Sequence, residues 1–208
     1  MDDMHGTEAL RQALLAARER GTPLRIERHG LEDASAHSRG IVVDVSPELV
    51  LLQQITERVD LDGFEVLRLE DVTGLETEWR ASRFLQRALE LKDQRPKRPA
   101  GPIDLAGMRE AVTSANAAYP LIVVQREATL PDELSIGRIR EETWAGFRLH
   151  WMNTTAGWEW DDELYQWSAI TRLEFGNEYE TTLAMVAEAD GARPPEHPDD
   201  GIDPDDDE

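Results

Sequence analysis

The chain contains 208 residues and no cysteine, and its net charge is −21. The lack of cysteine excludes disulfides, thiolate catalysis and thiolate metal sites. The acidic start and the lack of any apolar run of membrane-spanning length predict a cytoplasmic protein of bacterial type, without a signal peptide or a membrane partner.

Residues 1–91 predict a helix, a series of short strands and a second helix. Gly21 ends the first helix, and Asp62-Gly63 is a turn signal between two of the strands. The expected elements, in chain order, are a helix from about Thr7 to Arg20, strands at Pro23–Glu27, Ile41–Val45, Leu49–Gln54 and Phe64–Leu69, and a helix at Glu78–Leu91.

Residues 92–103 form a linker that is rich in proline and basic side chains, and the prolines make it stiff. Residues 104–189 then repeat the order of helix, strands and helix. The expected elements are a helix that begins at Asp104, strands at Pro120–Gln125, Gly137–Glu142, Phe147–Met152, Trp158–Trp160, Leu164–Trp167 and Thr171–Phe175, and a helix at Glu178–Ala189.

The segment 190–208 is predicted to be a disordered acidic tail, because it is rich in proline and nearly free of large apolar side chains. Residues 188–208 contain ten acids and one arginine, so the rest of the chain carries a net charge of −12. An acidic body disfavours non-specific binding to a nucleic-acid backbone.

The two halves are related by an internal repeat. When the sequence is moved along itself by 97 or 98 residues, few residues are identical but the apolar positions keep their phase. Two short repeats predict two domains of one architecture. The aligned pairs include Gly40 with Gly137 at an offset of 97, and Leu51 with Leu149 and Leu69 with Trp167 at an offset of 98.

A helix followed by about five short antiparallel strands resembles the Sm-like and SH3-like class of small β-barrels. The resemblance implies an α+β, mainly β fold of two tandem small antiparallel β-barrel repeats, each with an N-terminal and a C-terminal helix. Sm-like proteins read RNA partly with an Arg-Gly pair after a late strand, and neither Gly74–Glu76 nor Leu173–Gly176 contains one. The RNA site of that class is therefore not expected here. Residues 157–161 and 170–179 also resemble a pattern of uncharacterised bacterial proteins, which implies no function.

Five of the six tryptophans lie in the second repeat. A cluster of flat rings suits a base, a sugar or a proline-rich peptide. Trp151 and Trp167 occupy core positions of the repeat pattern. Trp158 and Trp160 share a strand face that is either core or surface. Trp144 lies at a predicted hairpin tip, where burial is difficult, and is the best candidate for a contact residue.

Basic side chains alternate with apolar ones in two neighbouring strands of the second repeat. If these strands pair as a hairpin, the basic side chains share an outward face that suits a carboxylate or a phosphate. The favoured alternative is cross-strand ion pairing on a solvated face. The candidate basic residues are Arg138, Arg140, Arg148 and His150, and their candidate acidic partners are Glu141, Glu142 and Glu159.

Two strands of the first repeat are apolar on both faces, which predicts that both faces are covered. Val42, Val50 and Leu52 are therefore candidate interface residues. These residues are covered by the other repeat, by a helix or by a second chain, and the last alternative would make the protein a homo-oligomer.

The sequence contains no recognisable catalytic or metal-binding motif. The carboxylate runs at 60–62 and 161–163 fit solvated turns better than cation sites. We therefore predict no enzyme activity, no metal and no cofactor. The nearest approach to a catalytic triad, within one predicted loop that would not hold its geometry, consists of His29, Asp33, His37 and Ser38.

These observations favour a non-catalytic protein- or peptide-binding module, such as an adaptor, an inhibitor or an immunity-like factor. The acidity favours a basic protein partner, because complementary fields speed encounter. One alternative is a nucleic-acid or nucleotide module that uses the basic patch together with Trp144. A second alternative is an acidic mimic of nucleic acid that occupies the groove of a basic protein.

Overall fold

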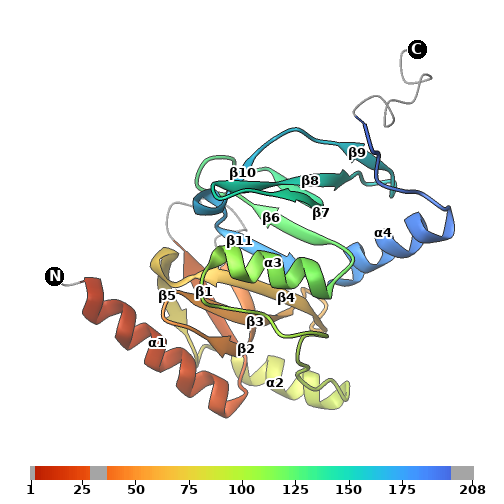
Figure 1. Ribbon diagram of the computed structural model, residues 1–208. Coiled ribbons are helices and arrows are strands. Elements are labelled where there is room, and N and C mark those ends of the chain that lie inside the picture. The colour runs from red at the N-terminus through yellow and green to blue at the C-terminus, as the bar shows by residue number, and fades with distance from the viewer. Residues whose placement is uncertain (1–2, 29–36, 198–208) are drawn as a thin grey trace.

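The computed structural model describes residues 3–28 and 37–197, which contain four α-helices and eleven β-strands (Figure 1). The helices are α1 (Asp3–Arg20), α2 (Ser82–Leu91), α3 (Met108–Ala118) and α4 (Glu178–Ala189). The first-half strands are β1 (Leu24–Arg28), β2 (His37–Val45), β3 (Leu49–Ile55), β4 (Leu61–Arg68) and β5 (Val72–Glu76). The second-half strands are β6 (Ile122–Gln125), β7 (Leu134–Glu142), β8 (Gly146–Met152), β9 (Trp158–Trp160), β10 (Tyr165–Gln166) and β11 (Arg172–Phe175). Two short 3₁₀ helices, Leu69–Asp71 and Trp167–Ala169, precede β5 and β11.

The expected helices and strands are present, but the prediction of two closed barrels is wrong. All eleven strands belong to one open antiparallel sheet in the order β10-β8-β7-β6-β11-β4-β3-β2-β1-β5, with β9 beside β8. A closed barrel would need β4 to pair with β5 of its own repeat. β4 pairs instead with β11, the last strand of the other repeat. β4 and β11 thus pair their backbone groups with each other, so neither repeat has to close into a barrel to protect this edge.

The internal repeat is visible in the strand topology. The two halves follow the same order, β4-β3-β2-β1-β5 and β9/β10-β8-β7-β6-β11. Leu52 lies opposite Val42, and Leu149 lies opposite Ile139, which places Leu52 and Leu149 at equivalent positions. The expected match of Leu51 with Leu149 is therefore wrong by one residue. The extra residue is inserted after β3 and β8, because the offset of 97 persists through those strands and becomes 98 at the 3₁₀ helices.

A glycine at the same place in both repeats lets neighbouring strands approach closely. A Cβ atom on Gly40 would lie 2.5 Å from the carbonyl oxygen of Gln53, and one on Gly137 would lie 2.3 Å from that of His150. Any other residue at either position would push the hairpin apart, so these glycines set the shape of β2–β3 and β7–β8.

The joint between the repeats is the pairing of β4 with β11. Phe64 lies opposite Phe175, and Val66 lies opposite Leu173. The two phenylalanine rings stack with their centroids 5.7 Å apart. Apolar side chains from both repeats therefore meet across one pair of strands.

The end of the joint is fixed by α4. The backbone N–H of Glu178, in the first turn of α4, donates to Oδ1 of Asp62 at 2.9 Å, so a side chain of the first repeat caps a helix of the second. A Cβ on Gly63 would lie 2.5 Å from the backbone nitrogen of Asn177. Asp62-Gly63 is thus part of β4 and not the predicted turn, which lies earlier, at residues 56–60.

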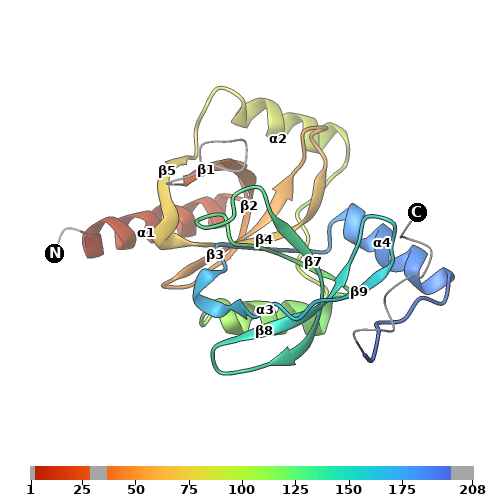
Figure 2. The same cartoon turned by 90° about the horizontal axis from the view of Figure 1, so that it is seen from above.

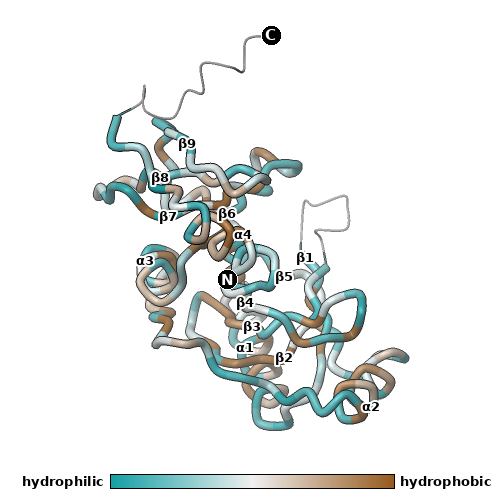
Figure 3. The backbone as a smooth tube through the Cα atoms, turned by 90° about the vertical axis from the view of Figure 1, so that its right-hand side faces the viewer, coloured by the Kyte–Doolittle hydropathy of each residue, from teal (hydrophilic) through white to brown (hydrophobic). Residues whose placement is uncertain are grey.

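The largest apolar cluster lies between the repeats and beneath α3 (Figure 2). It combines side chains of α3, β6, β8 and β11 with those that project from one face of β3 and β4. In Figure 3 the two repeats lie one above the other, and hydrophobic stretches follow β6 and β3. The first-repeat members of this cluster are Leu49, Leu51, Phe64 and Val66.

The candidate interface residues Val42, Val50 and Leu52 lie on the opposite face of the first repeat. They are buried in a second cluster with Leu14 and Ala17 of α1. A helix of the same chain therefore covers them, which was one of the three alternatives, and they offer no surface to a second chain.

The linker and the start of the tail pack on the protein. The backbone N–H of Lys97 donates to Oε1 of Gln53 at 2.7 Å, and that of Ala100 donates to the hydroxyl of Tyr119 at 2.8 Å. In the tail predicted to be disordered, Pro195 is buried. Residues 198–208 of that tail lie outside the described residues. Within residues 3–28 and 37–197, no helix is long and apolar enough to cross a membrane.

Candidate functional site

The predicted contact residues of the second repeat lie on β7, β8, β9 and the turn between β7 and β8. Arg138 lies opposite His150, and His150 lies opposite Trp160, so one row of side chains crosses three strands on one face. Toward its other end this face is covered by α4. The rest of this face, whose side chains range from half-buried to exposed, is called here the arginine–tryptophan surface. It consists of Arg138, Arg140, Arg148, His150, Trp158, Trp160 and, at the hairpin tip, Trp144.

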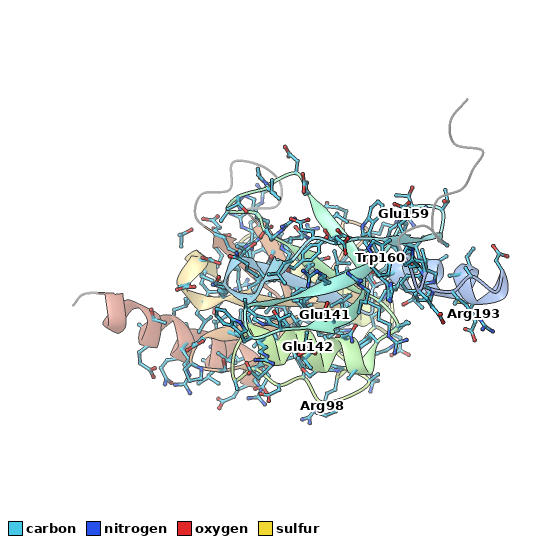
Figure 4. The ribbon with its side chains drawn as sticks, turned by 45° about the horizontal axis from the view of Figure 1, so that its top comes forward. Arg98, Glu141, Glu142, Glu159, Trp160 and Arg193 are labelled. Carbon is cyan, nitrogen blue, oxygen red and sulfur yellow. The ribbon has the colours of Figure 1, made fainter. Side chains whose placement is uncertain are left out.

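Trp160 organises the centre of this surface. The guanidinium of Arg140 stacks on its ring at 3.8 Å from the centroid. His150 contacts the rings of Trp158 and Trp160 edge-on, with centroids 6.5 and 6.2 Å apart. Figure 4 shows Trp160 and Glu159 over the end of the sheet that β9 forms. Trp158 also packs against the apolar cluster under α4, so it is half-buried and partly structural.

The positive charge of this surface is largely compensated. Arg140 donates to Oδ1 of Asp162 at 3.2 Å, and Arg148 donates to Oε2 of Glu141 at 3.2 Å. Burial, together with Arg140 and Arg138, lowers the pKa of His150, which keeps its imidazole neutral near pH 7. The cross-strand ion pairing expected as the alternative is therefore present for Arg148 and Glu141.

Trp144 is the most exposed large apolar side chain of the described residues, with 89% of its surface accessible. The turn that carries it is fixed, because the N–H of Thr143 donates to the carbonyl oxygen of Gly146 at 2.7 Å. The indole of Trp167 donates to the carbonyl oxygen of Thr143 at 3.1 Å and packs on Phe147. Trp167 thus supports the hairpin from the core, while Trp144 projects from it.

A buried ion cluster at the joint was not found from the sequence. Arg28, at the end of β1, binds Glu127 of the β6–β7 loop through two hydrogen bonds of 2.6 and 2.7 Å, and their side chains are 1% and 0% exposed. Arg172 of β11 lies 3.3 Å from Glu127 and 3.9 Å from Glu65 of β4. The cluster therefore links the two repeats through charges that are withdrawn from water.

Ser38 belongs to this cluster and not to a catalytic triad. Its hydroxyl donates to Oε2 of Glu65 at 3.0 Å, and Glu65 is 1% exposed. Burial raises the pKa of Glu65, against the attraction of Arg172. His37 begins β2. His29 and Asp33, the other two residues of the triad-like set that was not expected to be catalytic, lie outside the described residues.

A further buried carboxylate, that of Glu180 in the first turn of α4, makes the stability of the protein depend on pH. Burial raises its pKa from 4.5 to about 7, and the nearby Glu174 and Asp62 add to this. The native state therefore holds its proton more tightly than the unfolded state, and stability is lost as the pH rises from 4.5 to 7. Between about pH 5 and pH 8, we expect the free energy of unfolding of wild type to fall by about 1–3 kcal/mol relative to that of Glu180→Gln. Urea unfolding of both proteins measures this difference. Equal pH dependence of the two proteins would contradict this assignment.

In the part of the chain that the structure describes, no group of three or more histidine, aspartate or glutamate side chains is placed to hold a metal ion. The chain matches no protein-family model, no curated protein and no solved structure.

Proposed function

We propose that the chain is a non-catalytic protein- or peptide-binding module that contacts its partner through the arginine–tryptophan surface. The observation that carries this proposal is the 89% exposure of Trp144 at the tip of a well-ordered hairpin. Burial of such a ring by a partner is favourable by the hydrophobic effect. Tryptophan and arginine are also the residue types that contribute most to the centres of protein interfaces.

The charge arrangement favours a protein partner over a nucleic acid. Binding to nucleic acid depends on basic side chains that neutralise phosphates. On this surface Arg140 and Arg148 already bind Asp162 and Glu141, and the lowered pKa of His150 leaves it neutral. The net charge of −21 adds long-range attraction for a basic protein, which speeds encounter.

The proposal is tested by selecting a displayed library of random peptides on the immobilised full-length protein. A selected peptide is then synthesised, and its affinity is measured by fluorescence anisotropy. We expect Trp144→Ala to weaken binding by roughly thirtyfold or more, as for a central interface tryptophan. The matched control is Tyr179→Ala on α4, a 50% exposed aromatic outside this surface, which should leave the affinity unchanged.

Labelled single-stranded RNA and DNA are titrated beside the peptide at low and moderate salt. We expect no binding of either. A failure to select peptides, combined with nucleic-acid binding that weakens with salt and with Arg138→Glu, would replace this proposal with the nucleic-acid alternative.

A further inference from the structure

A second surface lies at the opposite end of the sheet, between α1 and the edge strand β5. Both elements lie at one end of the molecule in Figures 1 and 2. They enclose an open groove of about 890 Å³. Among the described strands, β5 pairs with β1 alone, so its outer edge is free along this groove. The groove is lined by Gly6, Leu10, Leu69, Glu70, Val72 and Leu75, among others.

The internal repeat shows what fills the equivalent place in the second half. There the last strand is β11, and its outer edge is occupied by β4 of the first repeat. Some residues that line the groove have counterparts in the second repeat. These counterparts line a cavity at the joint, together with Leu49 and Arg68. At the offset of 98 that applies to the 3₁₀ helices, Leu69 corresponds to Trp167 and Glu70 to Ser168. The groove beside β5 is therefore equivalent to the place beside β11 that β4 occupies, but no described strand occupies it.

The strand that fills the joint has a definite pattern. Phe64 and Val66 insert their side chains into the cluster beneath α3. Two residues later, Arg68 donates hydrogen bonds of 3.0 Å to the carbonyl oxygens of Trp167 and Ser168. The strand that fills the joint is thus antiparallel to β11, with apolar residues at positions 64 and 66 and an arginine at position 68.

We infer that the groove between α1 and β5 binds an extended segment of a partner protein with this same pattern: apolar, any residue, apolar, any residue, arginine. This inference rests on the proposed protein-binding function and adds a second contact surface to it. Leu10, Val72 and Leu75, the half-buried apolar side chains of the groove, receive the apolar side chains of the partner. The carbonyls of Leu69 and Glu70, which match those of Trp167 and Ser168, receive the arginine. The free edge of β5 supplies backbone hydrogen bonds, as in other cases of strand addition.

The occupant is another protein and not a second copy of this chain. In the second repeat the place of β4 is taken by β9 and β10, whose edge is interrupted by Asp161, Asp162 and Glu163. At an offset of 98, Phe64 corresponds to Asp162. A carboxylate would then enter an apolar groove without a partner, which is costly.

The test uses a fluorescent peptide with the sequence of residues 60–69 of this chain, which contains the β4 pattern, titrated into the full-length protein. We expect saturable binding that is lost when the peptide carries aspartate at the positions of Phe64 and Val66. Gly6→Trp should weaken binding by at least about tenfold, because its side chain enters the groove. A Cβ on Gly6 meets no atom within 4 Å, so the substitution is compatible with the fold. The matched control is Ala9→Trp, an exposed position of α1 outside the groove, which should bind as wild type.

No saturable binding, or equal binding by wild type and Gly6→Trp, would overturn the inference. Assembly of the wild-type protein that Gly6→Trp abolishes would also overturn it, since the occupant would then be a second copy. Trp144→Ala should leave the affinity for this peptide unchanged. If the peptide of residues 60–69 does not bind but selected peptides still bind in a way that depends on Trp144, the groove is rejected and the proposed function is kept.

Discussion

Replacing Arg28 with methionine is expected to lower the free energy of unfolding by about 3–5 kcal/mol, the range seen when one partner of a buried ion pair is removed. The side chains of Arg28 and Glu127 are 1% and 0% exposed, and Glu127 would remain buried without its two hydrogen bonds from Arg28, although Arg172 would still lie 3.3 Å away. Urea unfolding at neutral pH measures the change.

The double variant Arg28→Met/Glu127→Leu is the control for this prediction. It removes both charges and should recover at least about half of the loss, because the cost comes from a buried carboxylate that has lost one of its cations and not from the absent contact. A loss below about 1 kcal/mol in Arg28→Met would mean that water reaches the cluster.

Replacing Phe175 with alanine is expected to destabilise the protein by about 3–5 kcal/mol, as for other fully buried phenylalanines. The ring is 0% exposed and packs against Phe64 of the first repeat and Tyr119 after α3. Because this ring joins the repeats, both halves should unfold together at a lower temperature in a single calorimetric transition.

The matched control is Phe84→Ala on α2, where the ring is 63% exposed. It should change stability by no more than about 0.5 kcal/mol. If Phe175→Ala had an equally small effect, or if only the second repeat unfolded while the first stayed intact, the two repeats would not share a core.

Most helices and strands are predictable from the sequence because their signals are local, although β5 was not expected and α2 and α3 each begin four residues later than predicted. Glu178–Ala189 and Trp158–Trp160 have the predicted bounds, since a helical or alternating apolar pattern is confined to each segment. The sheet topology is not predictable in this way. Whether the edge of β4 pairs with β5 or with β11 depends on contacts between residues about 100 positions apart, which no local pattern reports.

For the candidate site, too, the features set by local sequence were predictable and those set by the fold were not. The alternation in β7 and β8 correctly places Arg138 and His150 on one face, because strand geometry alone determines it. The buried cluster of Arg28, Glu127 and Arg172 was missed. In the sequence each of these residues resembles an ordinary surface charge, and only the fold brings them together.

The central claim is that β4 and β11 join both repeats in one sheet. Nuclear Overhauser effects between backbone protons of the labelled protein test it most directly. The structure predicts cross-strand contacts between Val66 and Leu173 and between Phe64 and Phe175. Contacts from β4 to β5, with none from β4 to β11, would show two closed barrels and contradict the account.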